Sequence, residues 1–418
     1  MLRGEELHLE ELKGLADAAG YTVVKSIKQV RRADSSHQVG KGKVREIAGF
    51  VKELNVEKII FGNELKPVQA YNIAKVTGVE AIGRFQLILE IFAKRASSKE
   101  AQLQVHLATL RFQLPRIRES IRLTRRGEQQ GFRGIGRYEV DVHIEAIKRQ
   151  IAHILNELKI VRKKRNLQRT QRINYGFPSV SLAGYTYAGK TTLFNLLVEE
   201  SKSVNQGLFT TLSTTTRAMN FQNRNVLLTD TVGFIDKLPL VLVEAFHSTL
   251  EETALSDAII LVVDFHESIK EINRKLTCCI DTLNEIGAHG IPIITAMNKT
   301  DLLSKRKVQE KLTKLEELVQ NPVPISALRG TNIEGLKQKV IDCLDPEIQA
   351  SFVMPLSEEA IVFTSSLYTQ VNVLNSHYNV KKINVTLKAV PWLLEKIRGR
   401  IGKLGGQLLE TRREVQRV

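Results

Sequence analysis

The segment 180–197 constrains the fold of this chain more than any other. It reads VSLAGYTYAGKTTLFNLL, and Gly184, Gly189, Lys190 and Thr191 follow the pattern G-x-x-x-x-G-K-[ST] between a β-like run and a helical run. The glycines let backbone N–H groups turn inward around phosphates, the lysine reaches the β- and γ-phosphates, and the threonine hydroxyl reaches magnesium. The pattern therefore predicts a strand, a phosphate-binding loop and a helix.

A second motif follows about forty residues later. Asp230 and Gly233 form a D-x-x-G turn at the end of the apolar run NVLLTD. In such a turn the carboxylate faces the metal and the glycine amide faces the γ-phosphate. The next residue is Phe234, where many GTPases have a glutamine that orients the attacking water. We therefore expect slow intrinsic hydrolysis and a water-orienting group that comes from elsewhere.

A threonine-rich segment, LFTTLSTTTR (208–217), lies between these motifs. Its position predicts a loop that covers the nucleotide and completes the magnesium shell. Thr211 is the first choice for the metal contact, although neighbouring threonines compete for that role. Phe209 and Thr210 are expected beside the nucleotide.

The base-binding motifs lie nearer the C-terminus. Asn298, Lys299 and Asp301 follow a buried run in IPIITAMNKTDLL, and Ser326 and Ala327 occur in PVPISALRG. A carboxylate at the last position of the first motif accepts hydrogen bonds from guanine N1–H and its exocyclic amine, whereas adenine presents a mismatched edge. This set of motifs predicts binding of GTP and GDP, with Mg²⁺ as cofactor.

Together the motifs predict one set of site residues with three roles. Lys190, Thr211 and Gly233 are the predicted catalytic residues, and Thr191 and Thr211 are the predicted metal ligands. The predicted nucleotide-binding residues are Gly184, Tyr185, Thr186, Tyr187, Ala188, Gly189, Lys190, Thr191, Thr192, Phe209, Thr210, Thr211, Asp230, Gly233, Asn298, Lys299, Asp301, Ser326, Ala327 and Leu328.

Changes in pattern divide the chain into four predicted domains of α/β class. Residues 1–99 alternate helical stretches with short apolar runs such as EKIIFGN, which predicts a small α/β domain with a mainly parallel sheet. Residues 177–345 predict a doubly wound P-loop domain. In residues 346–418, EAIVFTSS, a short helix, INVTLKAV and WLLEKIRGRIGKL predict a small mixed α/β module.

Residues 100–176 predict a long antiparallel helical hairpin. Apolar residues recur at alternating spacings of three and four in two series, which places each series on one stripe of a helix. The series are Leu103, Leu107, Leu110, Leu114, Ile117, Ile121 and Ile144, Ile147, Ile151, Ile154, Leu158, Val161. The first helix is expected to bend or restart near Pro115. The predicted tip, RRGEQQGFRGIGR (125–137), has little apolar content to fold it.

Positive charge is concentrated in that hairpin. The whole chain has a formal net charge of +16, and residues 100–176 alone hold 17 basic and 7 acidic groups. Such a concentration favours polyanion binding over a uniformly solvated basic surface. A basic, glycine-containing turn, QVGKGKVREI (38–47), adds weaker evidence of phosphate or RNA contact.

Other features indicate a cytoplasmic protein. The longest apolar run, AIILVVDF (258–265), is far shorter than the roughly 20 residues needed to span a bilayer. The first 20 residues are acidic and lack the apolar core of a leader peptide. Three cysteines, Cys278, Cys279 and Cys343, lack metal-ligand spacing and are expected to be reduced thiols.

With these residues in view, the chain resembles the HflX-type GTPases of the Obg-HflX group, which belong to the translation-factor-related P-loop class. The resemblance covers roughly residues 37–345 and rests on GYTYAGKTTLFN, LFTTLSTTTR, DTVGFIDKLPLVLVEAFHSTLEE and LILEIFAKRASSKEAQLQVHLATLRFQLPRI. It implies a cytoplasmic protein, taken here as a monomer, that binds the large ribosomal subunit and its rRNA, inserts its hairpin tip near the peptidyl-transferase region, and separates or rescues stalled ribosomes.

Two departures from the family pattern qualify this resemblance. Tyr187 stands where the family usually has an asparagine that helps hold an accelerating potassium ion, which argues against potassium activation. After the tip, Arg137, His143, Ile144 and Glu145 replace four residues of the usual Glu-x-x-Leu-Glu-x-Asp-Arg-Arg run, so the tip contacts are expected to differ. The missing water-orienting group then comes from a backbone amide, from the loop 208–217 or from the ribosome.

Two alternatives stay open at this point. Phe234 and Tyr187 both remove groups that aid catalysis, as expected if the chain were an RNA or ribosome-binding chaperone with vestigial nucleotide binding. The GKGK segment (40–43) leaves open a second nucleotide, such as ATP, in the N-terminal domain.

Overall fold

The computed structural model describes residues 9–127, 136–174, 177–198, 215–221, 224–231, 233–235, 252–368 and 371–413. Of these, the residues up to Val161 belong to one compact unit and those from Arg162 onward to a second. None of the helices in these ranges combines the length and the hydrophobicity that crossing a bilayer requires.

The N-terminal region is a small α/β domain, as predicted. Its two short strands pair in parallel, and Leu65, Ile73 and Ala81 form part of its buried core. The elements are α1 (Leu9–Ala18), α2 (Lys41–Glu53), β1 (Lys58–Phe61), α3 (Pro67–Thr77), β2 (Glu80–Gly83) and α4 (Arg84–Arg95). The predicted glycine turn at 38–47 is mostly wrong, because α2 begins at Lys41 and contains Gly42. Of this segment, Gln38, Val39 and Gly40 lie before the helix, and Gly40 is its N-cap.

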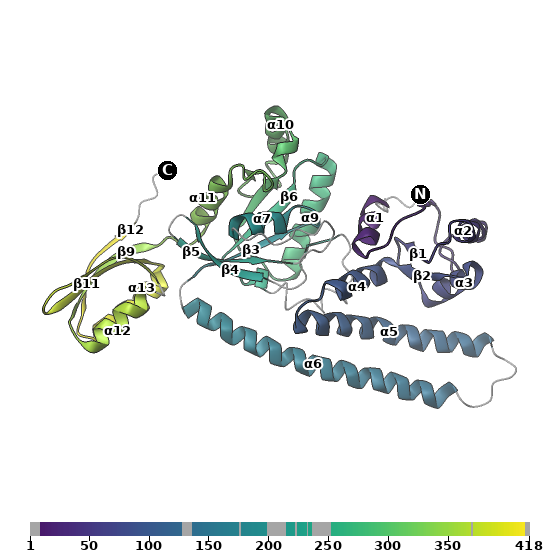
Figure 1. The fold of residues 1–418 in the computed structure, drawn as a ribbon, viewed down its shortest axis with the longest axis horizontal. Helices are drawn as coiled ribbons and strands as arrows, with labels where there is room; N and C mark the ends of the chain where they lie inside the picture. Colours follow the sequence, from purple (N-terminus) through teal and green to yellow (C-terminus); the bar gives the residue numbers. More distant parts are fainter. Residues whose placement is uncertain are drawn as a thin grey trace. The chain divides into compact units, whose positions relative to one another are not determined.

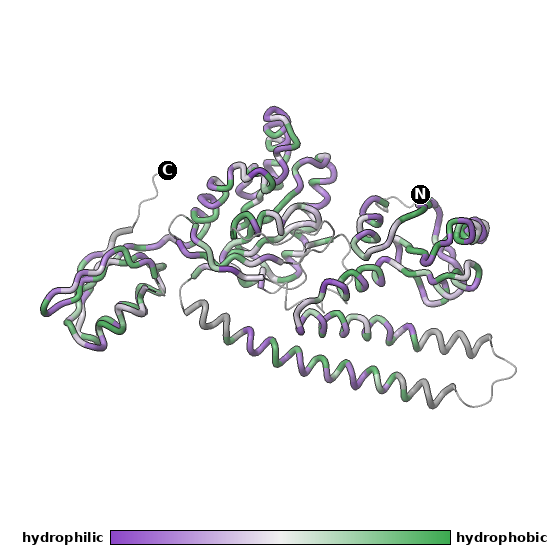
Figure 2. The backbone as a smooth tube through the Cα atoms, in the orientation of Figure 1, coloured by the Kyte–Doolittle hydropathy of each residue, from purple (hydrophilic) through white to green (hydrophobic). Residues whose placement is uncertain are grey.

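The helical hairpin consists of α5 (Lys99–Gly127) and α6 (Gly136–Asn174). Most residues of the two predicted apolar stripes pack against each other, and hydrophobic residues recur along both helices (Figures 1 and 2). The seam contains Leu103, Leu107, Leu110, Leu114 and Ile117 from α5, and Ile147, Ile151, Ile154 and Leu158 from α6. An ion pair of 3.3 Å between Lys99 and Glu157 joins the helices at the end away from the tip.

The hairpin differs from expectation in two respects. Helix α5 runs without a break through Pro115, so the predicted restart there is wrong. The predicted tip is shorter than expected, because α5 continues to Gly127 and α6 begins at Gly136. The rest of the tip, 128–135, lies outside the described residues.

The central domain is a six-stranded sheet with helices on both faces (Figure 1). The strand order is β4-β5-β3-β6-β7-β8, and every neighbouring pair is parallel except β4 with β5. Apolar residues of α7 and α11 pack on one face, and those of α9 and α10 pack on the other. The elements are β3 (Ser179–Gly184), α7 (Lys190–Val198), β4 (Thr215–Phe221), β5 (Arg224–Asp230), β6 (Ala258–Asp264), α9 (Ile269–Glu285), β7 (Ile293–Asn298), η1 (Thr300–Leu302), α10 (Lys305–Leu315), β8 (Val323–Pro324) and α11 (Ile333–Cys343).

This architecture confirms the doubly wound fold. One predicted boundary is wrong: the loop 208–217 ends earlier than expected, because Thr215 already begins β4. Thr215 and Thr216 pair with Asp230 and Thr229 of the antiparallel strand β5. The hydroxyls of Thr216 and Thr229 lie 3.0 Å apart across this pair of strands.

The C-terminal module is a four-stranded antiparallel sheet with two helices on one face (Figure 1). The strand order is β10-β11-β9-β12, and the chain runs β-α-β-β-α-β. The elements are β9 (Ile348–Pro355), α12 (Glu358–Leu367), β10 (Asn372–Tyr378), β11 (Lys382–Ala389), α13 (Pro391–Lys403) and β12 (Gln407–Arg413). The side chains of Phe352, Phe363, Val385 and Ile397 belong to its core. The prediction of a small α/β module is confirmed.

The hairpin seam yields a direct test. Ile154 is 3% exposed within the seam, whereas Ile160 on the same helix is 70% exposed. Truncating a buried isoleucine to alanine costs about 2–5 kcal/mol. We expect Ile154→Ala to accelerate amide hydrogen exchange in α5 and α6 by roughly 30-fold or more, and Ile160→Ala to change it less than about threefold. Equal effects of the two substitutions would contradict the seam.

Candidate functional site

The phosphate-binding loop connects β3 to α7 at the carboxyl edge of the sheet. Gly184 and Gly189 have φ angles of +144° and +94°, which L side chains rarely adopt. A Cβ at Gly184 would collide with the carbonyl oxygen of Val262 on β6, and one at Gly189 would collide with the side-chain amide of Asn298. Both glycines are therefore required by close neighbours as well as by their backbone conformation.

Lys190 lies inside this loop. Its Nζ donates hydrogen bonds to the carbonyl oxygens of Gly184, at 3.0 Å, and Tyr185, at 2.9 Å. Burial lowers the pKa of Lys190 to about 8, although the carboxylate of Asp230 opposes this effect. A bound anion would offset the cost of burying this ammonium group, as a phosphate-binding role requires.

Thr191 and Asp230 meet beside the loop. Thr191 Oγ1 lies 3.4 Å from Asp230 Oδ2, and Asp230 ends β5 with only 2% of its surface exposed. A hydroxyl and a buried carboxylate are the hard oxygen donors that Mg²⁺ prefers, and Mg²⁺ takes most of its other ligands from water and phosphate. These two residues therefore fit the predicted magnesium ion.

The D-x-x-G turn packs directly on the phosphate-binding loop. A Cβ at Gly233 would lie 2.9 Å from both Lys190 Nζ and Thr186 Cγ2, so any larger residue would force these side chains to shift. The backbone N–H of Phe234 donates to Gly184 O at 3.0 Å, and Thr186 N–H donates to Phe234 O at 2.9 Å. These two hydrogen bonds hold the turn against the loop.

The side chain of Phe234 belongs to the hydrophobic core. It is 2% exposed and packs in the same cluster as Tyr185, Phe265 and Leu276, on the face of the sheet that α9 covers. Phe234 therefore does not occupy the place of a water-orienting side chain.

Asn298 connects three parts of the site. Its Nδ2 donates to Ala188 O in the phosphate-binding loop at 2.8 Å, and its Oδ1 accepts from the backbone N–H of Ala327 at 2.9 Å. The side chain is 3% exposed. The asparagine thus joins the ends of β3, β7 and β8 by two hydrogen bonds.

Asp301 and Ser326 also lie together. Ser326 Oγ donates to Asp301 Oδ1 at 2.6 Å and accepts from the backbone N–H of Arg329 at 3.1 Å. Ser326 is fully buried, whereas Asp301 is exposed at the start of η1. This arrangement leaves a carboxylate of fixed orientation at the surface, which suits recognition of a guanine edge.

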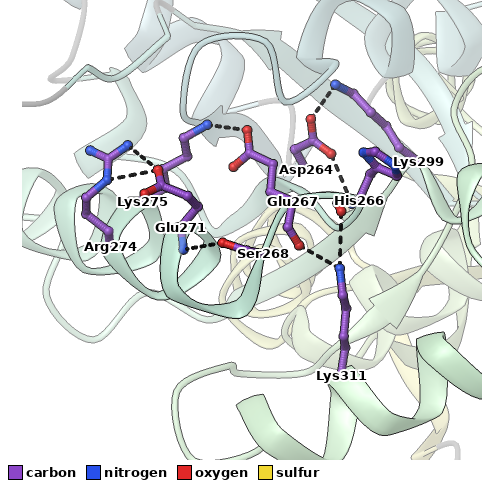
Figure 3. Close-up of polar contacts among 9 residues, drawn as sticks. All are labelled: Asp264, His266, Glu267, Ser268, Glu271, Arg274, Lys275, Lys299 and Lys311. Atoms are coloured by element: carbon purple, nitrogen blue, oxygen red, sulfur yellow. Dashed lines mark hydrogen bonds and ion pairs between the residues drawn. The ribbon is translucent and has the colours of Figure 1, made fainter. Parts of the chain in front are cut away.

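Asp264 was missed in the sequence analysis. It ends β6, and its Oδ2 lies 2.5 Å from Lys299 Nζ, while its Oδ1 accepts from the backbone N–H of His266 at 3.1 Å (Figure 3). The signal was present, because a carboxylate after a buried parallel strand must lie at the same sheet edge as the residues that follow the next strand. Asp264 therefore positions Lys299.

The loop after Asp264 is held by a lysine from α10. Lys311 Nζ donates to the carbonyl oxygen of Glu267, at 2.6 Å, and also contacts His266 O (Figure 3). It donates as well to the carbonyl oxygen of Phe265, at 2.7 Å. Burial lowers the pKa of Lys311. On the neighbouring helix, Lys275 pairs with Glu267 and lies 4.9 Å from the centre of the Tyr185 ring.

The structure gathers most of the predicted site residues at one sheet edge, and their binding roles stay predictions. Two predicted side chains are open to solvent, since Tyr187 is 50% exposed and Leu328 is 75% exposed. Tyr187 has a φ of +66°, a conformation that most residues avoid. The predicted residues Phe209, Thr210 and Thr211 lie outside the described residues.

A phosphate-binding loop, a D-x-x-G turn and an Asn-Lys-x-Asp motif at the carboxyl edge of a doubly wound sheet define a P-loop GTPase. Three family models match consecutive parts of the chain: the N-terminal region of GTP-binding GTPases at residues 6–93, their middle region at 95–172, and the 50S ribosome-binding GTPase domain at 179–299.

Individual proteins agree with these matches. The GTPase HflX of Methanocaldococcus jannaschii is 47% identical over 340 residues, which cover 81% of this chain and 84% of that protein. The GTPase HflX of Thermococcus kodakarensis is 42% identical over 350 residues, covering 82% and 78%. The crystal structure of the SsGBP–GDP complex has a TM-score of 0.50 and 30% identity, covering 82% and 96%. The chain therefore belongs to the HflX family of GTPases, which are GTP hydrolases.

The ion pair between Asp264 and Lys299 generates a prediction. Asp264→Asn removes the charge that positions Lys299, and hydrogen bonds to charged groups contribute about 1.5–3 kcal/mol. We expect GDP to dissociate roughly 10- to 150-fold faster, measured by stopped-flow release of a fluorescent GDP analogue. The matched control is Glu271→Gln on α9, whose carboxylate pairs with Arg274 instead. Unchanged release from the Asp264 variant would refute the positioning role.

Proposed function

We propose that this chain is a Mg²⁺-dependent GTPase that binds the large ribosomal subunit and its rRNA, and that it separates, rescues or recycles ribosomes in the cytoplasm as a monomer. Membership in a 50S ribosome-binding GTPase family supports the ribosomal role. The main observation in favour of the ribosomal role is a long basic hairpin on the same chain as a GTPase domain.

The charge of α6 supports rRNA as the partner. Arg162, Lys163 and Lys164 are exposed on this helix, which continues into a further basic stretch up to Arg172. Phosphate contacts supply most of the affinity of such surfaces for nucleic acid. We further propose that the domains divide as 1–99, 100–176, 177–345 and 346–418, which is compatible with the three matched family regions.

The proposed reaction converts GTP and water into GDP and phosphate. Lys190 stabilises the charge on the transferred phosphoryl group, and the amide of Gly233 donates to it. Thr191, Asp230 and the predicted Thr211 organise the magnesium ion, which neutralises charge on the β- and γ-phosphates. Asn298, Lys299 and Asp301 hold the guanine base, with Ser326 and Ala327 beside it. The SsGBP structure with GDP supports a guanine nucleotide at this site.

We propose that intrinsic hydrolysis is slow and that the ribosome stimulates it. The buried side chain of Phe234 supports this view, because the position after the D-x-x-G turn presents no polar group to water. The alternative of a chaperone with vestigial nucleotide binding loses its main support, since the family consists of GTP hydrolases and Phe234 has a structural role.

Base selectivity tests the proposed role of Asp301. Inosine triphosphate lacks the exocyclic amine of guanine, so one of the two hydrogen bonds to the carboxylate is lost. We expect the wild-type protein to bind GTP roughly tenfold or more tightly than inosine triphosphate, and Asp301→Ala to bind GTP at least about 30-fold more weakly without preferring either nucleotide. Calorimetric titration measures both affinities. Retained preference in the variant would remove Asp301 from guanine recognition.

Salt dependence tests the proposed ribosome contact. We expect the protein with a non-hydrolysable GTP analogue to co-sediment with large subunits, with an affinity that falls steeply between 50 and 200 mM salt. Replacing Lys163 and Lys164 together by glutamine should reduce the slope of log affinity against log salt by roughly 1 to 2. The same charge change at Lys305 and Lys314, two exposed lysines of α10, is the control and should leave the slope unchanged.

Two outcomes would contradict the proposal. Failure of the analogue-bound protein to co-sediment would remove the ribosomal role. An equal loss of slope in both double variants would show that the contact is unspecific and does not involve α6.

A further inference from the structure

The buried position of Phe234 leaves open which group of this GTPase orients the attacking water. Such a group must lie beside the γ-phosphate, and therefore near Lys190 and Gly233 in the proposed site. It must also have hydrogen-bonding capacity that the protein itself does not consume. Thr186, Thr191 and Thr231 are described threonines of the phosphate-binding loop, the start of α7 and the D-x-x-G turn.

Two of these hydroxyls are already engaged. Thr231 Oγ1 donates to the carbonyl oxygen of Leu182 at 2.6 Å, deep in the sheet. Thr191 Oγ1 lies 3.4 Å from Asp230 Oδ2, as expected for a pair that shares a metal ion. Both hydroxyls therefore already have a partner within the protein.

Thr186 differs from both. The residue is 4% exposed, and within the described part of the chain its Oγ1 is a buried atom that has no hydrogen-bond partner. Buried hydroxyls in native proteins are almost always hydrogen-bonded, so one left unpaired in a binding loop indicates a ligand or water as its partner.

The position of Thr186 is well defined. Its backbone N–H donates to Phe234 O at 2.9 Å, and the turn formed by Thr186 and Tyr187 leads into Ala188, whose carbonyl accepts from Asn298. Its Cγ2 and Lys190 Nζ both lie 2.9 Å from the point where a Cβ on Gly233 would stand. The Thr186 side chain thus lies, through its methyl group, beside the two residues proposed to contact the transferred phosphoryl group.

We propose that Thr186 is a further catalytic residue, whose hydroxyl accepts a hydrogen bond from the attacking water and so holds that water beside the γ-phosphate. The water oxygen bonds to the γ-phosphorus while the bond from that phosphorus to the β,γ-bridging oxygen breaks. The electron pair stays on GDP, and a water proton passes to the phosphate product. Thr186 keeps its own proton throughout. The proposal rests on the proposed phosphate contacts of Lys190 and Gly233.

A GTPase with phenylalanine after the D-x-x-G turn takes its water-orienting group from another residue. Phe234 fixes the backbone of Thr186 through its carbonyl oxygen, and Thr186 supplies the polar group. Orientation of a water by one positioned hydroxyl contributes rate without changing nucleotide affinity, because the water is not part of the bound nucleotide.

Three variants test the proposal. Thr186→Val removes the hydroxyl and keeps the shape, Thr186→Ala removes the hydroxyl and the steric bulk, and Thr186→Ser keeps the hydroxyl. Single-turnover GTP hydrolysis is measured without ribosomes and with large subunits, beside the affinity for a non-hydrolysable GTP analogue. We expect valine and alanine to slow hydrolysis by roughly 10- to 100-fold with affinity within about threefold of wild type, and serine to stay within about threefold in both.

The remaining outcomes decide against the proposal. Wild-type rates in the valine and alanine variants would overturn it, as would a serine variant as slow as the valine variant, because the methyl group would then matter and the hydroxyl would not. If affinity for the GTP analogue fell by the same factor as the hydrolysis rate, Thr186 would act in nucleotide binding and not in catalysis. Hydrolysis without ribosomes keeps this test independent of the ribosomal role, which co-sedimentation tests separately.

Discussion

The two hydrogen bonds of Asn298 are the constraint on which the rest of the site depends. One reaches Ala188 in the phosphate-binding loop and the other accepts from Ala327 after β8. A buried amide side chain that bonds to two of these loops at once fixes their spacing. The same side chain leaves no room for a Cβ at Gly189. The proposed base-recognition and phosphate-binding segments are therefore joined by one residue.

A second bond pattern connects phosphate binding to the D-x-x-G turn. The backbone hydrogen bonds between Phe234 and residues 184 and 186 extend the strand pairing beyond β3. The ring of Phe234 packs in the hydrophobic core next to these bonds. An aromatic residue is suited to this position because it fills the core beneath the loop. Its presence therefore reflects packing. Polar chemistry is left to residues of the phosphate-binding loop itself.

Much of this architecture could be predicted from local patterns. The stripes of the hairpin follow from the spacing of leucines and isoleucines, and the phosphate-binding loop follows from the order of its glycines, because both depend on residues that are near in sequence. The predicted restart at Pro115 was wrong because proline removes one helical hydrogen bond and adds strain, and packing of Leu110 and Leu114 in the seam offsets this loss of stability. The predicted turn around Gly42 was wrong because glycine is tolerated in the first turn of a helix, where Gly42 lies.

Features that depend on distant residues could not be predicted in the same way. The pairing of Asp264 with Lys299 joins the ends of two strands 35 residues apart, and the unpartnered hydroxyl of Thr186 is visible only when its surroundings are known. In the C-terminal module, EAIVFTSS lies in α12, and strands β9 and β10 lack an apolar run long enough to identify them. The metal contact of Thr211 stays a prediction.

The central claim is that Phe234 holds the turn while Thr186 faces the reaction. A structure of the protein with a non-hydrolysable GTP analogue and Mg²⁺ on the large ribosomal subunit tests it most directly. The account predicts that the Phe234 ring stays buried under α9 and that an ordered water bridges Thr186 Oγ1 and the γ-phosphate. A Phe234 ring turned out toward the γ-phosphate, or a Thr186 hydroxyl bonded only to protein, would contradict it.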